Sequence, residues 1–164
     1  MSLRVKKNYL IFNGIKFRCA IGKNGFIKEK CEGDGCSPIG TFKIEKIYYR
    51  KDRIRNIKSE IEIIEIDPND GWCDDQNHQQ YNKLIQFPFS YSAENLYRED
   101  NIYNIICVLN HNQNPTVKGL GSAIFIHVAS DSFTPTEGCV ALKQSDLLTI
   151  LSKVTSNTEI VFGD

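Results

Sequence analysis

The sequence has no excess of charge of either sign, because 20 lysine and arginine residues are balanced by 20 aspartate and glutamate residues. Proteins that bind nucleic acids usually carry a basic excess, so we expect no nucleic-acid partner. No run of 18 or more apolar residues is present, so we expect no membrane-spanning segment. The apolar run near the N-terminus is too short for a signal peptide, so export would need a leader outside this chain or another route.

The sequence also lacks the spacings that mark metal sites. Its three histidines and six cysteines never cluster as zinc ligands do, and no two cysteines have the CxxC spacing. We therefore expect no metal and no cofactor. Cys19 and Cys107 lie in the apolar runs FRCAI and IICVL, which favours buried free thiols. The even number of cysteines leaves a disulfide framework open as the alternative.

Strand signals dominate the chain, whose length suits one domain, residues 1–164. YLIF and IKFRCAI flank Asn13-Gly14, which predicts a tight hairpin. TFKIEKIYY, EIEIIEI and TEIVF predict further strands. The near-continuous apolar runs YNIICVLN and SAIFIHVA predict central strands that are covered on both faces. Residues 32–42 and the segment DPNDGWCDDQN predict loops.

Two helix starts are visible, at Ser92 and at Ser145-Asp146. The second would place four apolar residues on one helical face. These are Leu147, Leu148, Leu151 and Val154. Together with the strand signals, this predicts a fold that is mainly β with a few short helices.

The segment IFIHVASDSFTPTEGCVAL, residues 124–142, holds the strongest candidate for catalysis. Cys139 directly follows Gly138, and His127 lies 12 residues earlier, at the end of an apolar run. A cysteine nucleophile needs a partner base and hydrogen-bond donors for the developing oxyanion. Glycine permits unusual backbone conformations, so the N–H groups of Gly138 and Cys139 could be those donors. The spacing alone leaves a second interpretation open, a satisfied core histidine with an inert thiol.

IFIHVAS and TPTEGCVAL together resemble the signature of the L,D-transpeptidase catalytic domain (YkuD-like) family, in which a histidine-bearing strand leads to a [ST]-x-G-C loop. EGDGCSPIGTF is similar to the glycine-rich GDGxTPxG segment of that family. DGWCDD, the YN at residues 81 and 82, and VLNHN resemble features of one branch. The similarity runs from about residue 10 to residue 162 and implies an L,D-transpeptidase-like β-sandwich or barrel.

The resemblance implies that Cys139 is the nucleophile, His127 the base and Gly138 part of the oxyanion hole. An imidazolium close to Cys139 would lower the pKa of its thiol, so we expect a reactive thiolate. The implied partners are peptidoglycan stem peptides, the implied location is periplasmic or cell-wall-facing, and a monomer is favoured. Hydrolysis of the stem peptide, D-amino-acid exchange, amidation and a catalytically dead wall-binding module are the alternatives.

One position departs from the family pattern, because Glu137 stands where many members have the histidine of S-H-G-C. The Glu137 side chain would either turn inward and orient His127 or face solvent. We also consider Glu137 a candidate for substrate binding.

Three further residues are candidates for substrate binding. His111 and Asn110 follow the strand YNIICVLN and could reach the same rim as His127. Trp72 precedes two aspartates, and an aromatic side chain beside carboxylates suits a cationic or amide-rich ligand. Structural roles in well-ordered loops would explain the same three residues.

Overall fold

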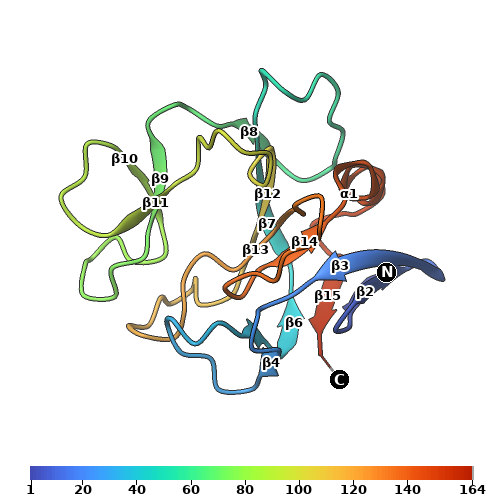
Figure 1. Ribbon diagram of the computed structural model, residues 1–164, viewed down its shortest axis with the longest axis horizontal. Coiled ribbons are helices and arrows are strands. Elements are labelled where there is room, and N and C mark those ends of the chain that lie inside the picture. The colour runs from blue at the N-terminus through green and yellow to red at the C-terminus, as the bar shows by residue number, and fades with distance from the viewer. Residues whose placement is uncertain (164) are drawn as a thin grey trace.

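The computed structural model describes residues 1–163 and contains mainly β-strands (Figure 1). The largest element is a sheet of ten strands. Its order is β6 (Gly40–Phe42), β15 (Glu159–Phe162), β1 (Ser2–Val5), β2 (Tyr9–Phe12), β3 (Ile15–Ala20), β14 (Val140–Leu142), β13 (Phe125–Val128), β12 (Ile105–Leu109), β7 (Ile44–Tyr49) and β8 (Ile63–Glu65).

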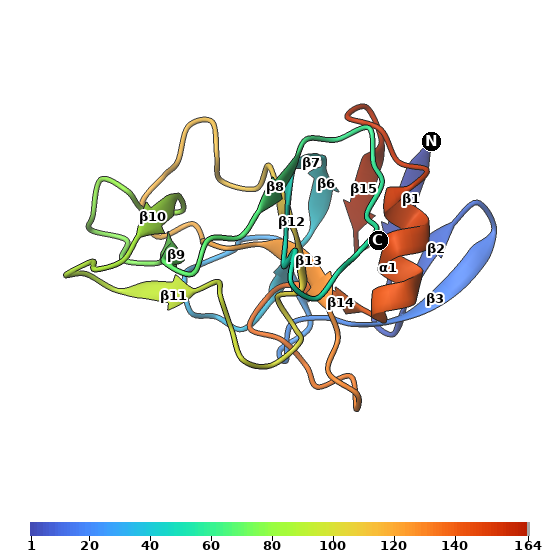
Figure 2. The same cartoon turned by 90° about the horizontal axis from the view of Figure 1, so that it is seen from above.

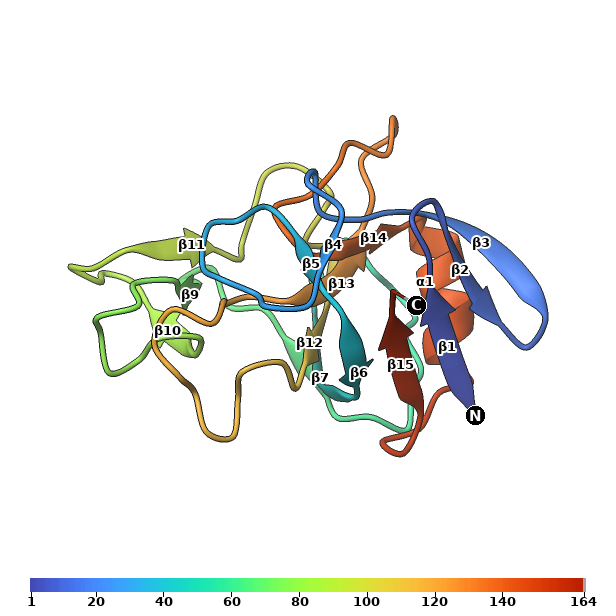
Figure 3. The same cartoon turned by 90° about the horizontal axis from the view of Figure 1, so that it is seen from below.

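The large sheet is curled. Strands β6 and β7 are separated by Lys43 alone, yet β6 forms one edge of the sheet and β7 is the neighbour of the opposite edge strand. One residue cannot bridge a flat sheet of this width, so the two ends must approach each other. Figure 3 shows β6, β15, β1 and β2 side by side in the order of the sheet. The expectation of a mainly β, barrel-like fold is confirmed.

Strand β12 shows how the sheet divides the core. Ile105, Cys107 and Leu109 belong to one hydrophobic cluster, whereas Ile106 and Val108 belong to a second. Alternate side chains point to opposite faces, so both faces of β12 are buried, as its apolar run predicted. The first cluster includes helix α1 (Gln144–Leu151), and the second includes aromatic residues near the candidate site.

A smaller sheet of three strands lies at one end of the molecule, with α1 and β1–β3 at the other (Figures 1 and 2). It has the order β10 (Leu84–Gln86), β9 (Asp70–Cys73) and β11 (Ala93–Asn95). The loop predicted over DPNDGWCDDQN is therefore wrong, because its middle is the fully buried strand β9. The helix predicted from Ser92 is also wrong, because pairing with β9 makes the segment strand β11.

The two remaining local predictions agree with the structure. Asn13 and Gly14 have positive φ values of 50° and 77° and join β2 to β3, as a two-residue hairpin turn requires. Helix α1 buries Leu147, Ile150 and Leu151. It is the one α-helix within residues 1–163, so the expected few helices reduce to one.

Two short strands, β4 (Phe26–Ile27) and β5 (Ser37–Pro38), pair in parallel. The loop predicted over residues 32–42 is therefore wrong in its second half, which contains β5 and β6. In the part of the chain that the structure describes, no helix is long and apolar enough to cross a membrane. The assignment of residues 1–164 to a single domain stays a prediction.

Cys107 tests the doubly covered core. Its side chain is 0% exposed in β12, and burial raises the pKa of its thiol. We expect Cys107→Ser to lower the free energy of unfolding by about 1–3 kcal/mol, because a buried hydroxyl would need a partner. Urea denaturation measures this loss. Cys31→Ser, at an exposed thiol, is the control, and equal stabilities of the two variants would contradict the assignment.

Candidate active site

Strands β13 and β14 bring His127 and Cys139 to one face of the sheet. The two strands are parallel, and His127 is paired in register with Ala141. Side chains two residues apart point to the same face, so Cys139 lies on the face of Ala141 and Phe125 on that of His127. The Phe125 N–H lies 3.4 Å from Cys139 Sγ, which confirms that the two segments meet there.

Both side chains line one cavity of about 590 Å³. A cavity of that size suits a small peptide or a drug-sized ligand. Its floor is formed by the strands, and one wall by the segment that connects β13 to β14. The lining residues with polar or reactive side chains include Lys30, Glu32, Asp74, Ser92, Glu94, Arg98, Tyr103, Ser122, His127, Thr136, Glu137 and Cys139.

His127 is held as a neutral imidazole. Its side chain is buried, and Nδ1 lies 2.8 Å from the Val128 carbonyl oxygen. Because a carbonyl only accepts, Nδ1 must carry the proton, which leaves the lone pair on Nε2. Burial lowers the pKa of His127 to about 4. The Tyr103 ring packs edge-on at 5.4 Å between centroids and fixes the imidazole plane. His127 is therefore arranged as a proton acceptor.

Cys139 is held as a neutral thiol. Its Sγ donates to the Ala123 carbonyl oxygen at 3.1 Å and accepts from the Phe125 N–H. Burial raises the pKa of the thiol to about 12, and the negative charge of Glu94 acts in the same direction. The expectation of a resting thiolate is therefore wrong. Desolvation disfavours the charged form of both groups, so the resting pair is uncharged.

Three backbone segments meet around Gly138 without intervening side chains. A Cβ on Gly138, whose φ is +148°, would lie 2.8 Å from the Cys36 carbonyl oxygen. A Cβ on Gly22 would lie 2.6 Å from the Gly35 carbonyl oxygen. The fully buried Ser37 hydroxyl joins the segments, because it accepts from the Gly22 N–H at 2.9 Å and donates to the Gly138 carbonyl at 2.8 Å. Gly138 is thus required by close packing.

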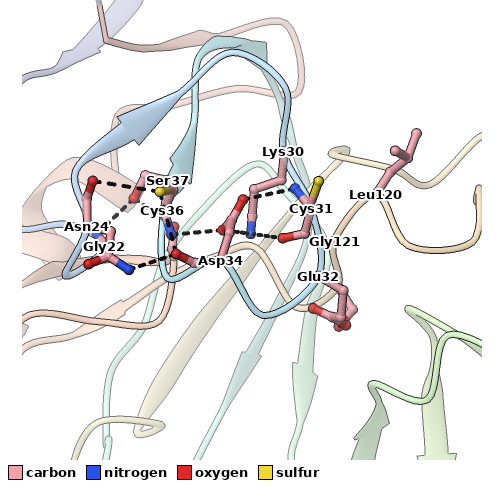
Figure 4. A network of polar contacts seen from close by, with 12 residues as sticks. Gly22, Asn24, Lys30, Cys31, Glu32, Asp34, Cys36, Ser37, Leu120 and Gly121 are labelled. Carbon is pink, nitrogen blue, oxygen red and sulfur yellow. Dashed lines mark hydrogen bonds and ion pairs between the residues drawn. The ribbon is translucent and has the colours of Figure 1, made fainter.

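The glycine-rich loop behind this contact is organised by Asp34 (Figure 4). Its carboxylate accepts from the Cys31 and Cys36 N–H groups, each at 2.9 Å, and from Lys30 Nζ. These local bonds lower the pKa of Asp34, although desolvation opposes them. Asp34 is a turn residue, whereas Lys30 is buried and lines the cavity.

The oxyanion donors predicted at Gly138 and Cys139 stay a prediction. The Gly138 N–H already donates to Thr136 Oγ1 at 3.1 Å, and that hydroxyl donates to the Cys139 carbonyl at 2.6 Å. An oxyanion at this place would have to compete with the threonine hydroxyl for the Gly138 N–H.

Glu137 lies at the cavity rim and faces solvent. Its side chain is 77% exposed and forms an ion pair of 2.9 Å with Lys23, which is also exposed. This geometry agrees with the solvent-facing alternative rather than with an inward carboxylate that orients His127.

None of Trp72, His111 and Asn110 lines the cavity formed by the described residues, and their role in substrate binding stays a prediction. Trp72 is buried, and its indole N–H donates to Asn82. His111 Nε2 lies 2.9 Å from the Leu120 carbonyl. Asn110 accepts from the Lys43 N–H at the start of β7. All three hold loops in place, as their structural alternatives stated.

The sequence reasoning missed a pair of side chains on the cavity wall, Glu94 and Tyr103. The Tyr103 hydroxyl donates to Glu94, and burial raises the pKa of both groups. The sequence predicts a helix for SAENLYRED, and an acidic residue near the start of a helix needs no special role. The signal that could have found Glu94 is its strand register, because β11 pairs with the buried β9.

Within residues 1–163, no group of three or more histidine, cysteine, aspartate or glutamate side chains is placed to hold a metal ion. The geometry is that of a histidine on β13 and a cysteine directly before the adjacent strand β14, both of which line one cavity. A family model, the L,D-transpeptidase catalytic domain (YkuD), matches residues 5–162, which is nearly the whole chain. The protein therefore belongs to the L,D-transpeptidase catalytic domain family. A search of curated proteins found no significant match.

The buried neutral His127 predicts an acid-sensitive part of the stability. Its pKa is about 4, against 6.5 for an ordinary histidine. Between these pH values the unfolded chain binds more protons than the folded one, so the free energy of unfolding falls as the pH decreases from 6.5 to 4.

We expect His127→Gln, which cannot be protonated, to lose less stability than the wild type across this window, by about 3 kcal/mol. Urea denaturation near pH 7 and near pH 4.5 provides the comparison. The difference between the two proteins isolates His127 from the carboxylates that titrate in both. Identical losses would show that the histidine is not buried in its neutral form.

Proposed function

We propose that the protein is a peptidoglycan L,D-transpeptidase in which Cys139 is the acyl-accepting nucleophile and His127 its base. One observation carries the proposal. A neutral imidazole with its lone pair on Nε2 and a thiol directly before the adjacent strand line the same cavity. The family membership supplies the class of reaction and the wall substrate.

In the first half-reaction, His127 Nε2 accepts the Sγ proton while Sγ bonds to an amide carbonyl carbon of a stem peptide. The tetrahedral intermediate collapses, the C–N bond breaks, and His127 returns the proton to the leaving amine. For a stem tetrapeptide the leaving group is the terminal D-alanine. The product is a thioester on Cys139. Since thiol and imidazole are both neutral at rest, proton transfer accompanies attack and does not precede it.

In the second half-reaction, an amine of another stem peptide attacks the thioester carbonyl. A new C–N bond forms, the C–S bond breaks, and the proton lost by the amine passes through His127 to the Cys139 sulfur. No redox step is involved. The same thioester would give hydrolysis, exchange or amidation with another acceptor, so the acceptor is decided by experiment.

The charge of the cavity supports a substrate that carries free amines. The two lining cations are neutralised, because Lys30 pairs with Asp34 and Arg98 with Asp100. Three lining carboxylates instead accept hydrogen bonds from neutral hydroxyls. These contacts are Ser122 to Glu32, Ser92 to Asp74 and Tyr103 to Glu94. The side-chain amine of meso-diaminopimelate and the acceptor amine both suit such a lining. A periplasmic or wall-facing location follows from this substrate.

Purified protein with tetrapeptide muropeptides tests the proposal. We expect cross-linked dimers and released D-alanine by mass spectrometry, and no product from Cys139→Ala. His127→Gln should lower turnover by about 10²- to 10⁴-fold, the range for a general base. Cys19→Ser, at a buried thiol remote from the cavity, is the matched control. Tripeptides would indicate a carboxypeptidase, whereas turnover by Cys139→Ala would exclude the nucleophile.

Glu137 provides the test of the departure from the family pattern. Its carboxylate is exposed, and an exposed ion pair contributes about 0.2–1 kcal/mol. We therefore expect Glu137→Gln to lower turnover by less than about tenfold, well below the loss typical of an acid–base group. Gly138→Ala should lose far more activity, because its Cβ would meet the Cys36 carbonyl. A hundredfold loss in folded Glu137→Gln would place the carboxylate in the catalytic set.

A further inference from the structure

The segment DGWCDD and the YN that follows it are unusual features of the sequence to which the proposed mechanism gives no role. Trp72, Tyr81 and Asn82 are almost completely buried, at 4%, 3% and 2% exposure. None of the three lines the cavity of the described chain. Tyr81 and Asn82 nevertheless bond to Gly121 and Ala123, which lie shortly before β13, and the Trp72 indole bonds to Asn82.

Asn82 is the centre of these contacts. Its Oδ1 accepts from Trp72 Nε1 and from the Ala123 N–H, both at 3.0 Å. Its Nδ2 donates to the carbonyls of His111 at 3.2 Å and Asn112 at 2.8 Å. Two donors and two acceptors fill the hydrogen-bonding capacity of the amide, so its orientation is fixed. Nearby, the Tyr81 hydroxyl accepts from the Gly121 N–H at 3.1 Å.

Ala123 carries the effect of Asn82 to the nucleophile. Its φ is +53°, a conformation that costs a non-glycine residue about 1–3 kcal/mol and persists only where neighbours impose it. Asn82 binds its N–H, and its carbonyl accepts the Cys139 thiol at 3.1 Å. One residue therefore connects the buried amide to the sulfur.

We propose that Asn82, oriented by Trp72, is a positioning residue that fixes the Ala123 carbonyl against the Cys139 thiol and so sets the direction of the S–H bond. The inference deepens the proposed function and rests on Cys139 being its nucleophile. With the proton directed at Ala123 and the Phe125 N–H on the sulfur, the thiol has one defined rotamer. Defined geometry of this kind is what efficient attack requires.

The Ala123 carbonyl also favours the protonated form of Cys139, because it can accept from a thiol but not from a thiolate. Loosening this carbonyl should therefore make the thiol more acidic while misaligning it for attack. Glu94 and Tyr103 face Cys139 from other elements, and Lys30 also acts on its pKa. These groups stay unchanged when Asn82 is replaced.

The variant Asn82→Gly removes the amide and keeps the backbone conformation, since Asn82 has a φ of 58° and glycine accepts positive φ. Asn112→Gly is the matched control. Asn112 also has a positive φ, of 50°, and a side chain that bonds its own loop at Val117 and Gly121. It makes no side-chain contact with Ala123 in the part of the chain that the structure describes.

The measurement is the rate at which iodoacetamide alkylates Cys139 as a function of pH, resolved by peptide mass spectrometry. In Asn82→Gly we expect alkylation near pH 8 to rise by about tenfold, equivalent to one unit of thiol pKa. We expect kcat on a tetrapeptide to fall by about 10- to 100-fold with little change in KM. Asn112→Gly should match the wild type. Continued protection of Cys73 and Cys107 excludes unfolding as the cause.

Trp72→Phe is a milder second variant. It removes one donor to Asn82 and keeps an aromatic ring against Phe125, where the centroids lie 5.1 Å apart. It should shift the alkylation profile in the same direction by a smaller factor. An unchanged Cys139 profile in both folded variants, or in Trp72→Phe alone if Asn82→Gly does not fold, overturns the inference. Equal shifts in Asn82→Gly and Asn112→Gly also overturn it.

Alkylation of Cys139 can be measured without enzyme turnover, so each of the two proposals can be contradicted without the other. A wild-type protein without transpeptidase activity would remove the proposed function while the pH profiles still decide the role of Asn82. Full activity in Asn82→Gly with an unshifted profile would remove the positioning role and leave the nucleophile intact.

Discussion

The parallel pairing of β13 with β14 is the constraint on which the site depends. Parallel neighbours cannot be joined by a tight turn, so the chain must leave the sheet and return to its starting end. Residues 129–139 make that passage and contribute Ser130, Thr134, Pro135 and Thr136 to the cavity. The register that places His127 opposite Ala141 also puts Cys139 on the same face. One pairing thus sets the geometry of the candidate site and of the wall that encloses it.

The position of Cys139 along this face depends on backbone packing from both sides. On one side, Gly22, Ser37 and Gly138 approach so closely that no Cβ fits at either glycine. On the other side, Ala123 is held in a strained conformation, and its carbonyl binds the thiol. Neither support is a catalytic group. Both supports depend on backbone conformations that the chain would not adopt without these contacts.

Much of this architecture could be predicted from the sequence where the signal was local. The Asn13-Gly14 turn, the two apolar central strands and the last helix each depend on residues close in the chain. The identity of Cys139 and His127 as candidates also came from one short segment and its resemblance to a family. The predictions of the turn, the strands and the helix are correct because local propensity and tertiary structure favour the same conformation.

The failures have a common physical cause, which is burial by distant segments. The polar residues around Asp70–Cys73 predict a loop, but pairing with β10 and β11 makes this segment a buried strand. Ser92 resembled a helix cap, but the register of β11 against β9 overrides that preference. Nothing local shows that Asn82 accepts the Trp72 N–H, so the sequence leaves both a substrate contact and a structural role open for Trp72. The neutral state of the Cys139 thiol likewise depends on desolvation by residues that are distant in the sequence.

That neutral state connects the charge of the cavity to the chemistry. Burial makes the Cys139 thiolate unfavourable, and the charge of Glu94 makes it more so. An ammonium group bound beside Glu94 would cancel part of that charge and lower the pKa of the thiol. In the proposed reaction, a substrate with free amines would therefore help to activate its own nucleophile. The thiol would stay protonated in the empty cavity and pass its proton to His127 as the sulfur attacks the bound stem peptide. The carboxylates that line the cavity, which no sequence motif indicates, would then contribute both to recognition of the substrate and to the rate of the reaction.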